Sequence, residues 1–284
     1  MIYLFHKGVI SLKVDDIEEL KDIAKRIRID IIKEVYSAKS GHPGGALSIA
    51  DILTVLYFNQ MNINPKDPNN ANRDRLVLSK GHASPALYAT LAERGFFSAD
   101  KLESFRKLGS ILQGHPDMKH IPGVDMSTGS LGQGLSAANG MAMMSKLDKK
   151  GIRVYTILGD GEIEEGQIWE AAMTASHYKL DNLCVIVDNN NLQIDGDIKS
   201  VMNSYPIDKK FESFGFVVFN VDGNNIEELI KAFESAKVVK EKPVAIIAKT
   251  TKGKGVSFME NKAEWHGKAP SDEEYKQAIM ELEK

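Results

Sequence analysis

Two polar residues that each follow an apolar segment constrain the fold of this chain more than any other feature. Residues 153–159 and 183–187 have the uniformly apolar character of buried strands, and residues 164–178 between them have helical spacing. A strand, a crossover helix and a second strand form a βαβ unit, in which the two strands run parallel. Asp160 and Asn190 follow these strands, so we expect both side chains at one edge of the sheet, where open α/β sheets bind ligands.

The aspartate and the asparagine offer the kind of oxygen donor that Mg²⁺ prefers. This ion requires an octahedron of oxygens and is commonly held by one or two protein side chains together with phosphates. Gly159 and Gly161 flank Asp160 and allow the backbone to turn tightly and to approach a ligand closely. An isolated Gly-Asp-Gly is most often a surface turn. Here a strand precedes it, a helix follows and Asn190 ends the next strand, so we predict a site for Mg²⁺ and a diphosphate.

The remainder of the chain continues to alternate between strands and helices. We expect further strands at 76–78, 216–221 and 243–249, and helices at 15–39, 48–59, 84–94, 98–107, 134–147, 208–214, 225–239 and after 267. Ser48 and Ser98 are predicted to cap two of these helices. Apolar strands between helices indicate an α/β fold with a doubly wound, mostly parallel sheet and helices on both faces. We expect a single domain over 1–284, with an N-terminal extension at 1–14 and an active-site loop at 250–270.

Composition argues against several classes of partner. The 284 residues carry a net charge of −3 at pH 7, which does not favour a broad surface for nucleic acid or membrane. Residues 126–145 lack charge but contain four glycines and several polar side chains, so they are a poor membrane span. The apolar run Met1 to Phe5 is too short for a signal peptide, and the single cysteine, Cys184, cannot form an intrachain disulfide. We therefore expect a cytoplasmic protein with a small-molecule substrate.

Four of the seven histidines adjoin a glycine in a predicted loop: His42, His82, His115 and His266. Loops on a rigid scaffold commonly carry binding residues. A histidine there can donate hydrogen bonds to phosphate or hydroxyl oxygens and can move protons near neutral pH. A zinc cluster is one alternative, although no pair has close chelating spacing, and a histidine that only satisfies its loop backbone is another. We predict that the four histidines serve the site.

Two glycine-rich segments add to the picture. Residues 129–134 place glycines at a helix start, where free amides and the helix dipole can face an anion or a flat ring, but their spacing is not that of a dinucleotide fingerprint. Residues 250–255 do not match the P-loop pattern, and we expect their lysines to be solvated.

The motifs, taken in chain order, resemble those of transketolase. They are Lys39-Ser40-Gly41-His42-Pro43-Gly44, Ser79-Lys80-Gly81-His82, Gly114-His115-Pro116, Pro122-Gly123-Val124, Thr128-Gly129-Ser130-Leu131-Gly132-Gln133-Gly134, Gly159-Asp160-Gly161 through Glu165-Gly166, and Ile194-Asp195-Gly196. With His266 they run from about residue 39 to 267, nearly the whole chain. The chain looks like the diphosphate-binding half of transketolase. The resemblance implies the thiamine diphosphate-binding fold (a PP-type domain), with thiamine diphosphate and a divalent metal such as Mg²⁺, Ca²⁺ or Mn²⁺.

The resemblance also implies residue roles. Asp160, Asn190 and the carbonyl of Leu192 would hold the metal. The other positions near the cofactor would be His82, Gly159, Gly161 and His266 at the diphosphate, Gly129 and Leu131 against the aminopyrimidine, and Glu165. The residues that contact ketose hydroxyls and move protons would be His42, His115 and His266. Glu165 and Glu170 match the family's interface carboxylates, which are thought to link two active sites of a dimer, although the helix dipole alone also explains acids at these positions.

Two departures from the family pattern bear on function. Full-length enzymes commonly continue Ala-Pro after the glycine that matches Gly44, whereas Gly45-Ala46-Leu47 follows here, which leaves the course of this loop open. Transketolases also run to more than twice this length, and their second domain supplies a glutamate and aromatic residues to the pyrimidine ring. We therefore expect the N-terminal subunit of a split transketolase. It would form a dimer of heterodimers with a separate C-terminal subunit and transfer a two-carbon ketol unit between sugar phosphates of the pentose phosphate pathway.

Two alternatives share the metal motif. The α subunit of a thiamine diphosphate-dependent 2-oxo acid dehydrogenase is also half an enzyme, but a short oxo acid has no chain of hydroxyls for His42, His82 and His115 to bind. A catalytically silent module that kept the fold is the second alternative, and the intact metal and histidine positions argue against it.

Overall fold

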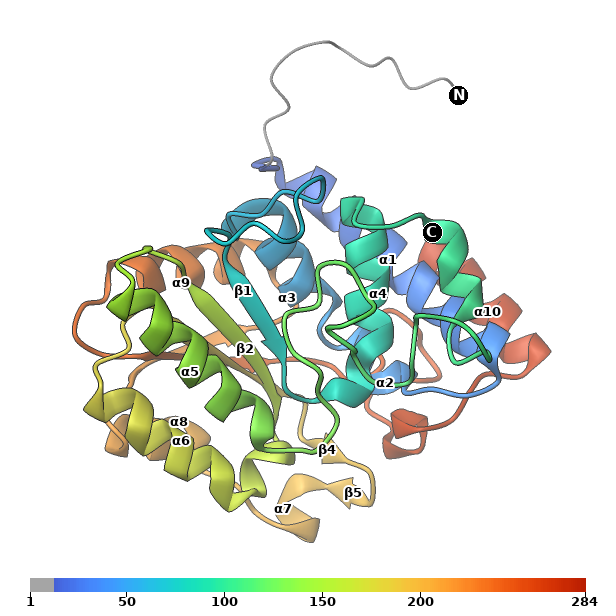
Figure 1. The fold of residues 1–284 in the computed structure, drawn as a ribbon. Coiled ribbons are helices and arrows are strands. Elements are labelled where there is room, and N and C mark those ends of the chain that lie inside the picture. Colours follow the sequence, from blue (N-terminus) through green and yellow to red (C-terminus); the bar gives the residue numbers. More distant parts are fainter. Residues whose placement is uncertain (1–12) are drawn as a thin grey trace.

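The computed structural model describes residues 13–284 and contains a five-stranded sheet whose neighbouring strands are all parallel (Figure 1). The strands are β1 (Arg75–Leu78), β2 (Val154–Gly159), β3 (Leu183–Asn189), β6 (Val217–Asp222) and β7 (Val244–Lys249), in the spatial order β1-β2-β3-β7-β6. The prediction of a parallel α/β sheet is confirmed. All five strands direct their carboxyl ends to one edge, so the segments that follow them meet there.

Helices cover both faces of this sheet. One face packs against α1 (Ile17–Ala38), α3 (Ala50–Val55), α4 (Ser84–Arg94) and α9 (Ile226–Val238), with α10 (Asp272–Glu283) beside α1. The other packs against α5 (Gln133–Leu147), α6 (Gly166–His177) and α8 (Ile207–Ser213). Strand residues alternate between the two cores: Tyr155 and Ile157 belong to the first, and Val154 and Leu158 to the second. Burial on both faces explains why the strands are uniformly apolar in sequence.

The shorter elements lie mainly near the carboxyl edge of the sheet and around its loops. They are α2 (Pro43–Leu47), η1 (Leu56–Gln60), η2 (Gly81–Ala83), η3 (Ala99–Ser104), η4 (Glu162–Glu164), the antiparallel pair β4 (Leu192–Gln193) and β5 (Gly196–Asp197), α7 (Ile198–Val201) and η5 (Ala263–His266). The segment after Gly44, whose course the sequence left open, is the buried single turn α2. The predicted 250–270 loop folds against it, since the Gly253 amide donates to the Gly44 carbonyl at 3.0 Å.

Two predicted helix starts are wrong. Ser48 does not cap α3, whose N-cap position is Ile49; its hydroxyl instead bonds the Asp188 carboxylate and the Gly45 carbonyl. Residues 98–107 form only the 3₁₀ helix η3, and the Ser98 hydroxyl bonds the Asp100 side chain instead of a backbone amide. This segment buries a single residue within the helix, Leu102, so it lacks the apolar stripe that stabilises a longer α-helix.

The predicted N-terminal extension at 1–14 lies outside the described residues except for Lys13 and Val14, as does the whole Met1 to Phe5 run. Val14 is tied to the fold, because its amide donates to the Phe58 carbonyl at 2.7 Å. No helix between residues 13 and 284 is long and apolar enough to cross a membrane.

Candidate active site

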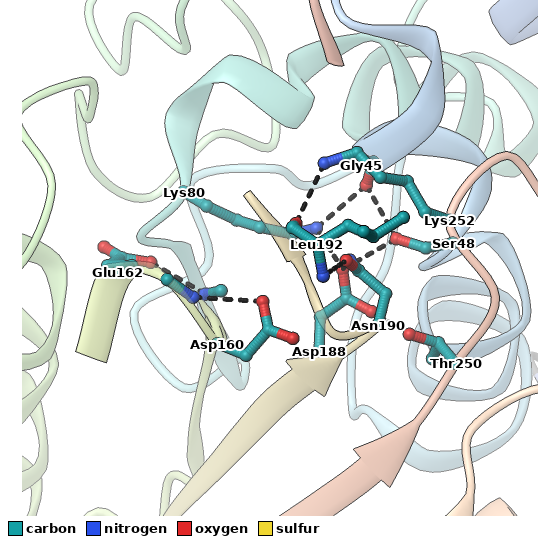
Figure 2. A network of polar contacts seen from close by, with 12 residues as sticks. Gly45, Ser48, Lys80, Asp160, Glu162, Asp188, Asn190, Leu192, Thr250 and Lys252 are labelled. Atoms are coloured by element: carbon teal, nitrogen blue, oxygen red, sulfur yellow. Dashed lines mark hydrogen bonds and ion pairs between the residues drawn. The ribbon is translucent and has the colours of Figure 1, made fainter. Parts of the chain in front are cut away.

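The predicted convergence of Asp160 and Asn190 occurs at the carboxyl ends of β2 and β3. These strands are neighbours in register, with Gly159 opposite Asp188, so the residues that follow them emerge side by side. Both side chains line one cavity of about 140 Å³, together with their sequence neighbours Gly161 and Leu192. Residues from segments far away in sequence also line it, among them Lys80, His82, Leu131, Lys252 and His266. Figure 2 shows the polar groups gathered at this edge. The geometric premise of the predicted site is therefore present.

Asp160 is a buried carboxylate held by backbone amides. Its two oxygens accept from the amides of Gly161 at 3.0 Å and Asn191 at 2.6 Å, and only 2% of the residue is exposed. In the described part of the chain, no lysine, arginine or histidine nitrogen forms an ion pair with it. Burial, and then the charge of Asp188, raises the pKa of Asp160 to about 7. A carboxylate in this position is stabilised by a bound cation.

Asn190 and Leu192 add two further oxygen donors. The Asn190 Oδ1 atom accepts from the Leu192 amide at 3.1 Å, and the Leu192 carbonyl accepts from the Lys252 ammonium at 3.0 Å. Each carbonyl oxygen has a second lone pair that can face a cation. A carboxylate, a carboxamide and a backbone carbonyl are the ligands of a hard cation such as Mg²⁺ or Ca²⁺. Within residues 13–284 no group of three or more His, Cys, Asp or Glu side chains is placed to hold a metal ion. The donor set fits a divalent cation whose remaining ligands come from a diphosphate.

Three of the four predicted histidines form one cluster. The ring centroids of His42, His82 and His266 lie 5.0 to 5.5 Å apart, although the rings come from three separate loops. His115 is more exposed and stands apart from these rings, against Gly129, where an added Cβ would lie 3.2 Å from its Cδ2 atom. Gly129 has φ of +155°, so both space and backbone conformation favour glycine there.

The pKa of each of the four histidines is lowered, which favours the neutral imidazole. Burial, and then the charge of Arg106, lowers the pKa of His42 to about 4 and also lowers that of His115. Burial, and then the charge of Lys252, lowers the pKa of His266 to about 3. Burial, and then Lys80, holds the pKa of His82 well below its ordinary value. A neutral imidazole has one nitrogen that donates and one that accepts, which suits both hydroxyl binding and proton transfer.

Two buried lysines belong to the site, although sequence reasoning gave neither a role. Lys80 pairs with Asp188 at 2.5 Å and donates to the Gly45 carbonyl at 2.8 Å. Lys252 donates to the Leu192 carbonyl and lies 3.0 Å from His266 Nδ1, and only 1% of it is exposed. The expectation that the lysines of 250–255 are solvated is therefore wrong for Lys252. Burial, and then the charge of Lys80, lowers its pKa to about 8.

A further acidic residue at the cavity is Glu162. It is buried and accepts from the amides of Gly132 and Gly159, each at 3.0 Å, which joins the 129–134 loop to the end of β2. Glu165 and Glu170 lie exposed at the start and on the surface of α6, outside the cavity. The predicted cofactor contact of Glu165 and the interface role of both residues stay predictions. The signal for Glu162 was its place three residues beyond Gly159, inside the recognised motif.

Known proteins are similar to this chain over most of its length. The family model described as "Transketolase, thiamine diphosphate binding domain" matches residues 19–282. An apulose-4-phosphate transketolase subunit from Phocaeicola vulgatus is 44% identical, over 94% of this chain and 94% of that protein. A 6-deoxy-6-sulfo-D-fructose transketolase subunit from a Clostridium species is 46% identical, over 94% of this chain and 97% of that protein. Human transketolase is 48% identical, over 94% of this chain but only 42% of its own length.

Solved structures agree with the sequence comparison. A crystal structure of transketolase from Campylobacter jejuni superposes with a TM-score of 0.88 at 39% identity, covering 94% of this chain and 43% of that one. The fold and the site define the cofactor-binding domain of a thiamine diphosphate-dependent enzyme. The chain belongs to the transketolase family, in which it matches the N-terminal, thiamine diphosphate-binding domain.

These findings decide several of the predictions. The predicted family, its fold, the enzyme class, and thiamine diphosphate with a divalent metal as cofactors are confirmed. The chain spans nearly the full length of the relatives named as subunits and less than half of the single-chain transketolases. The 2-oxo acid dehydrogenase alternative is not favoured, because the matched family and the named relatives are transketolases.

Proposed function

We propose that this chain is the N-terminal subunit of a split transketolase. With a separate C-terminal subunit it transfers a two-carbon ketol unit from a ketose phosphate to an aldose phosphate. The observation that supports this most directly is the meeting of Asp160, Asn190 and Leu192 in one cavity beside a cluster of neutral histidines. The proposed metal is Mg²⁺, and the proposed compartment is the cytoplasm.

The proposed ligand set follows the donors described above. Asp160, Asn190 and the Leu192 carbonyl would hold the metal, and His82, His266 and the Gly161 backbone would lie near the diphosphate, with Gly129 and Leu131 toward the pyrimidine. When bound, thiamine diphosphate supplies a carbon nucleophile that attacks the ketose carbonyl and then accepts the electrons of the broken carbon-carbon bond. The protein contributes the fixed position of that cofactor relative to the sugar.

The histidines provide the proposed sugar contacts. We assign His42 a contact with a ketose hydroxyl; its Nδ1 atom is buried, and no described residue forms a hydrogen bond with it. His266 lies beside it, and burial, and then the charge of Lys252, lowers its pKa to about 3. The Lys252 ammonium donates to His266 Nδ1, which leaves the Nε2–H group to donate to a sugar or phosphate oxygen. We assign His115, which is exposed and lies against Gly129, a contact with a hydroxyl further along the sugar chain.

The names of two relatives support the proposal of a partner subunit. Single-chain transketolases continue well beyond the part that this chain matches, and two relatives of its own length are named as subunits. We propose a C-terminal subunit that supplies the pyrimidine-binding half and a dimer of heterodimers as the assembly. The names of the two relatives refer to apulose 4-phosphate and 6-deoxy-6-sulfo-D-fructose, so these sugars belong beside those of the pentose phosphate pathway among the candidate substrates.

The decisive experiment combines the purified chain with a candidate C-terminal subunit. Ketol transfer is measured with Mg²⁺, thiamine diphosphate and a panel of ketose and aldose phosphates, together with the two sugars above, of which the second carries a sulfonate in place of a phosphate. We expect turnover only with both subunits present. Full turnover by this chain alone would refute the split-enzyme proposal. Pyruvate decarboxylation with a redox dye would support the dehydrogenase alternative, and failure of the complex to bind thiamine diphosphate would support a silent module.

A further inference from the structure

Asp188 is the centre of a buried polar network that has no assigned role. It lies opposite Gly159 in the last pair between β2 and β3, is 0% exposed and accepts hydrogen bonds from four side chains (Figure 2). The donors are the Lys80 ammonium at 2.5 Å, the Ser48 hydroxyl at 2.6 Å, the Asn190 amide at 2.9 Å and the Thr250 hydroxyl. These residues follow α2, β1, β3 and β7, so one carboxylate joins the ends of several elements.

The contact with Asn190 decides which way its carboxamide points. An ionised carboxylate can only accept hydrogen bonds, and the Leu192 amide can only donate one. The Asn190 Nδ2 atom therefore faces Asp188, and Oδ1 faces Leu192. If the Asn190 carboxamide were rotated by 180°, its oxygen would face the Asp188 carboxylate and its NH₂ group would face the Leu192 N–H, and both contacts would be repulsive. Asp188 thus fixes the oxygen of Asn190 on the side where it serves as a cation ligand.

The contact with Asp188 holds the positively charged Lys80 ammonium in one position. The ammonium is buried and is shared between the Asp188 carboxylate and the Gly45 carbonyl. The hydroxyls of Ser48 and Thr250 donate to the same carboxylate, so every side chain that contacts Asp188 in this network presents a donor to it. Without Asp188 the ammonium would have no anionic partner, and the buried carboxylate of Asp160 lines the same cavity. A buried charge without a partner is strongly unfavourable, so the lysine would compete with a metal for Asp160.

We propose that Asp188 is a positioning residue for the metal site: it fixes the Asn190 carboxamide with its oxygen toward the cation and keeps Lys80 away from Asp160. The site is thereby arranged before the cation and the diphosphate arrive. The proposal rests on the metal site of the proposed function. Residues that orient metal ligands typically change metal affinity about 10- to 100-fold when they are replaced.

Two double variants test the orientation of Asn190. Asp188→Asn with Lys80→Met and Asp188→Leu with Lys80→Met both remove the ion pair, and both replace it with neutral groups, a change that buried pairs commonly tolerate. In the first variant residue 188 can still accept a hydrogen bond from the Asn190 amide, and in the second it cannot. Both variants lack Lys80, so any effect of its loss cancels in the comparison. The measurement is isothermal titration of Mg²⁺ into the two-subunit complex at saturating thiamine diphosphate, with the melting temperature of the metal-free complex as a check on folding.

We expect the leucine variant to bind Mg²⁺ at least about tenfold more weakly than the asparagine variant, with similar melting temperatures. Equal affinities within about twofold would overturn the orientation role. The single variant Asp188→Asn, which retains Lys80, should bind Mg²⁺ more weakly than Asp188→Asn with Lys80→Met. Equal binding there would overturn the role in holding Lys80.

A further control is Thr250→Val, which removes one hydrogen bond to Asp188 but leaves its contacts with Asn190 and Lys80 in place. We expect its Mg²⁺ affinity to stay within about threefold of wild type; a loss as large as that of the leucine variant would show that any damage to the network has the same effect. If the wild-type complex shows no Mg²⁺-dependent binding of thiamine diphosphate, the proposed function fails. If it binds and the double variants do not differ, the inference about Asp188 fails alone.

Discussion

Two regions along the carboxyl edge of the sheet differ in how far they are buried, and we call them the buried end and the exposed end. At β2 and β3, Asp160, Asp188 and Asn190 are almost completely buried around a small cavity. At β6 and β7, an open groove of about 600 Å³ is lined by polar residues that include Asp222 and Lys249, both exposed. Parallel strands place loops at both ends, so topology alone does not make the site. The difference lies in desolvation, which leaves charges at one end in need of a partner and leaves those at the other in water.

The largest effect is expected from the buried end. Asp160→Ala removes the only carboxylate of the predicted metal ligands, and we expect the apparent affinity of the two-subunit complex for thiamine diphosphate with Mg²⁺ to fall at least ~100-fold. Isothermal titration measures this effect. Asp222→Asn, at the exposed end, is the matched control and should bind as wild type. An Asp160→Ala complex that retained Mg²⁺-dependent binding would remove the basis of the comparison.

Next comes the histidine cluster. His266→Asn removes a neutral imidazole that touches both Lys252 and His42, and we expect kcat/KM for ketol transfer to fall by about 10²-fold or more, because general acid-base groups contribute on that scale. Steady-state kinetics with both subunits provides the measurement. The exposed His177→Gln is the control, with kcat/KM expected to be unchanged. Equal activities of the two variants would contradict a role for the cluster.

A smaller effect concerns stability and pH. The pKa of His42 is about 4 in the folded chain and near 6.5 when unfolded, so between these values the unfolded chain binds more protons. Its contribution to stability is therefore complete above pH 6.5 and is lost as the pH falls toward 4. In His42→Asn the free energy of unfolding should depend less steeply on pH over this interval. Urea unfolding of the cofactor-free chain at pH 5 and pH 7 measures the two slopes, and identical slopes would contradict the shift.

The smallest effect is expected at the open groove. Lys249→Gln removes an exposed charge there, and surface changes of this kind usually alter the free energy of unfolding by no more than about 0.5 kcal/mol. Cofactor affinity and ketol transfer should remain at wild-type values. A marked loss of either would show that the groove is also functional and that burial does not separate the two ends.

The fold and part of the site could be predicted from the sequence because both follow from local patterns of apolar and polar residues. The βαβ pattern placed Asp160 and Asn190 at adjacent strand ends, which the register of β2 and β3 confirms. It could not reveal Asp188 or Lys80, because Asp188 directly follows an apolar run, beside the residues of the recognised motif, and its partners come from four separate segments. Ser48 was mistaken for a helix cap because its true acceptor is 140 residues away.

The contact between the loop after α1 and the loop after β7 has a consequence for how the domain forms. The rings of His42 and His266 meet edge to face, and the Gly253 amide donates to the Gly44 carbonyl, although these segments lie far apart in the sequence. Contacts between segments so far apart in sequence form late in folding, since the chain between them must be ordered first. During synthesis on the ribosome, the histidine cluster therefore cannot assemble until the segment that carries His266 has emerged, and a fragment ending before residue 263 would carry the metal ligands without the complete cluster.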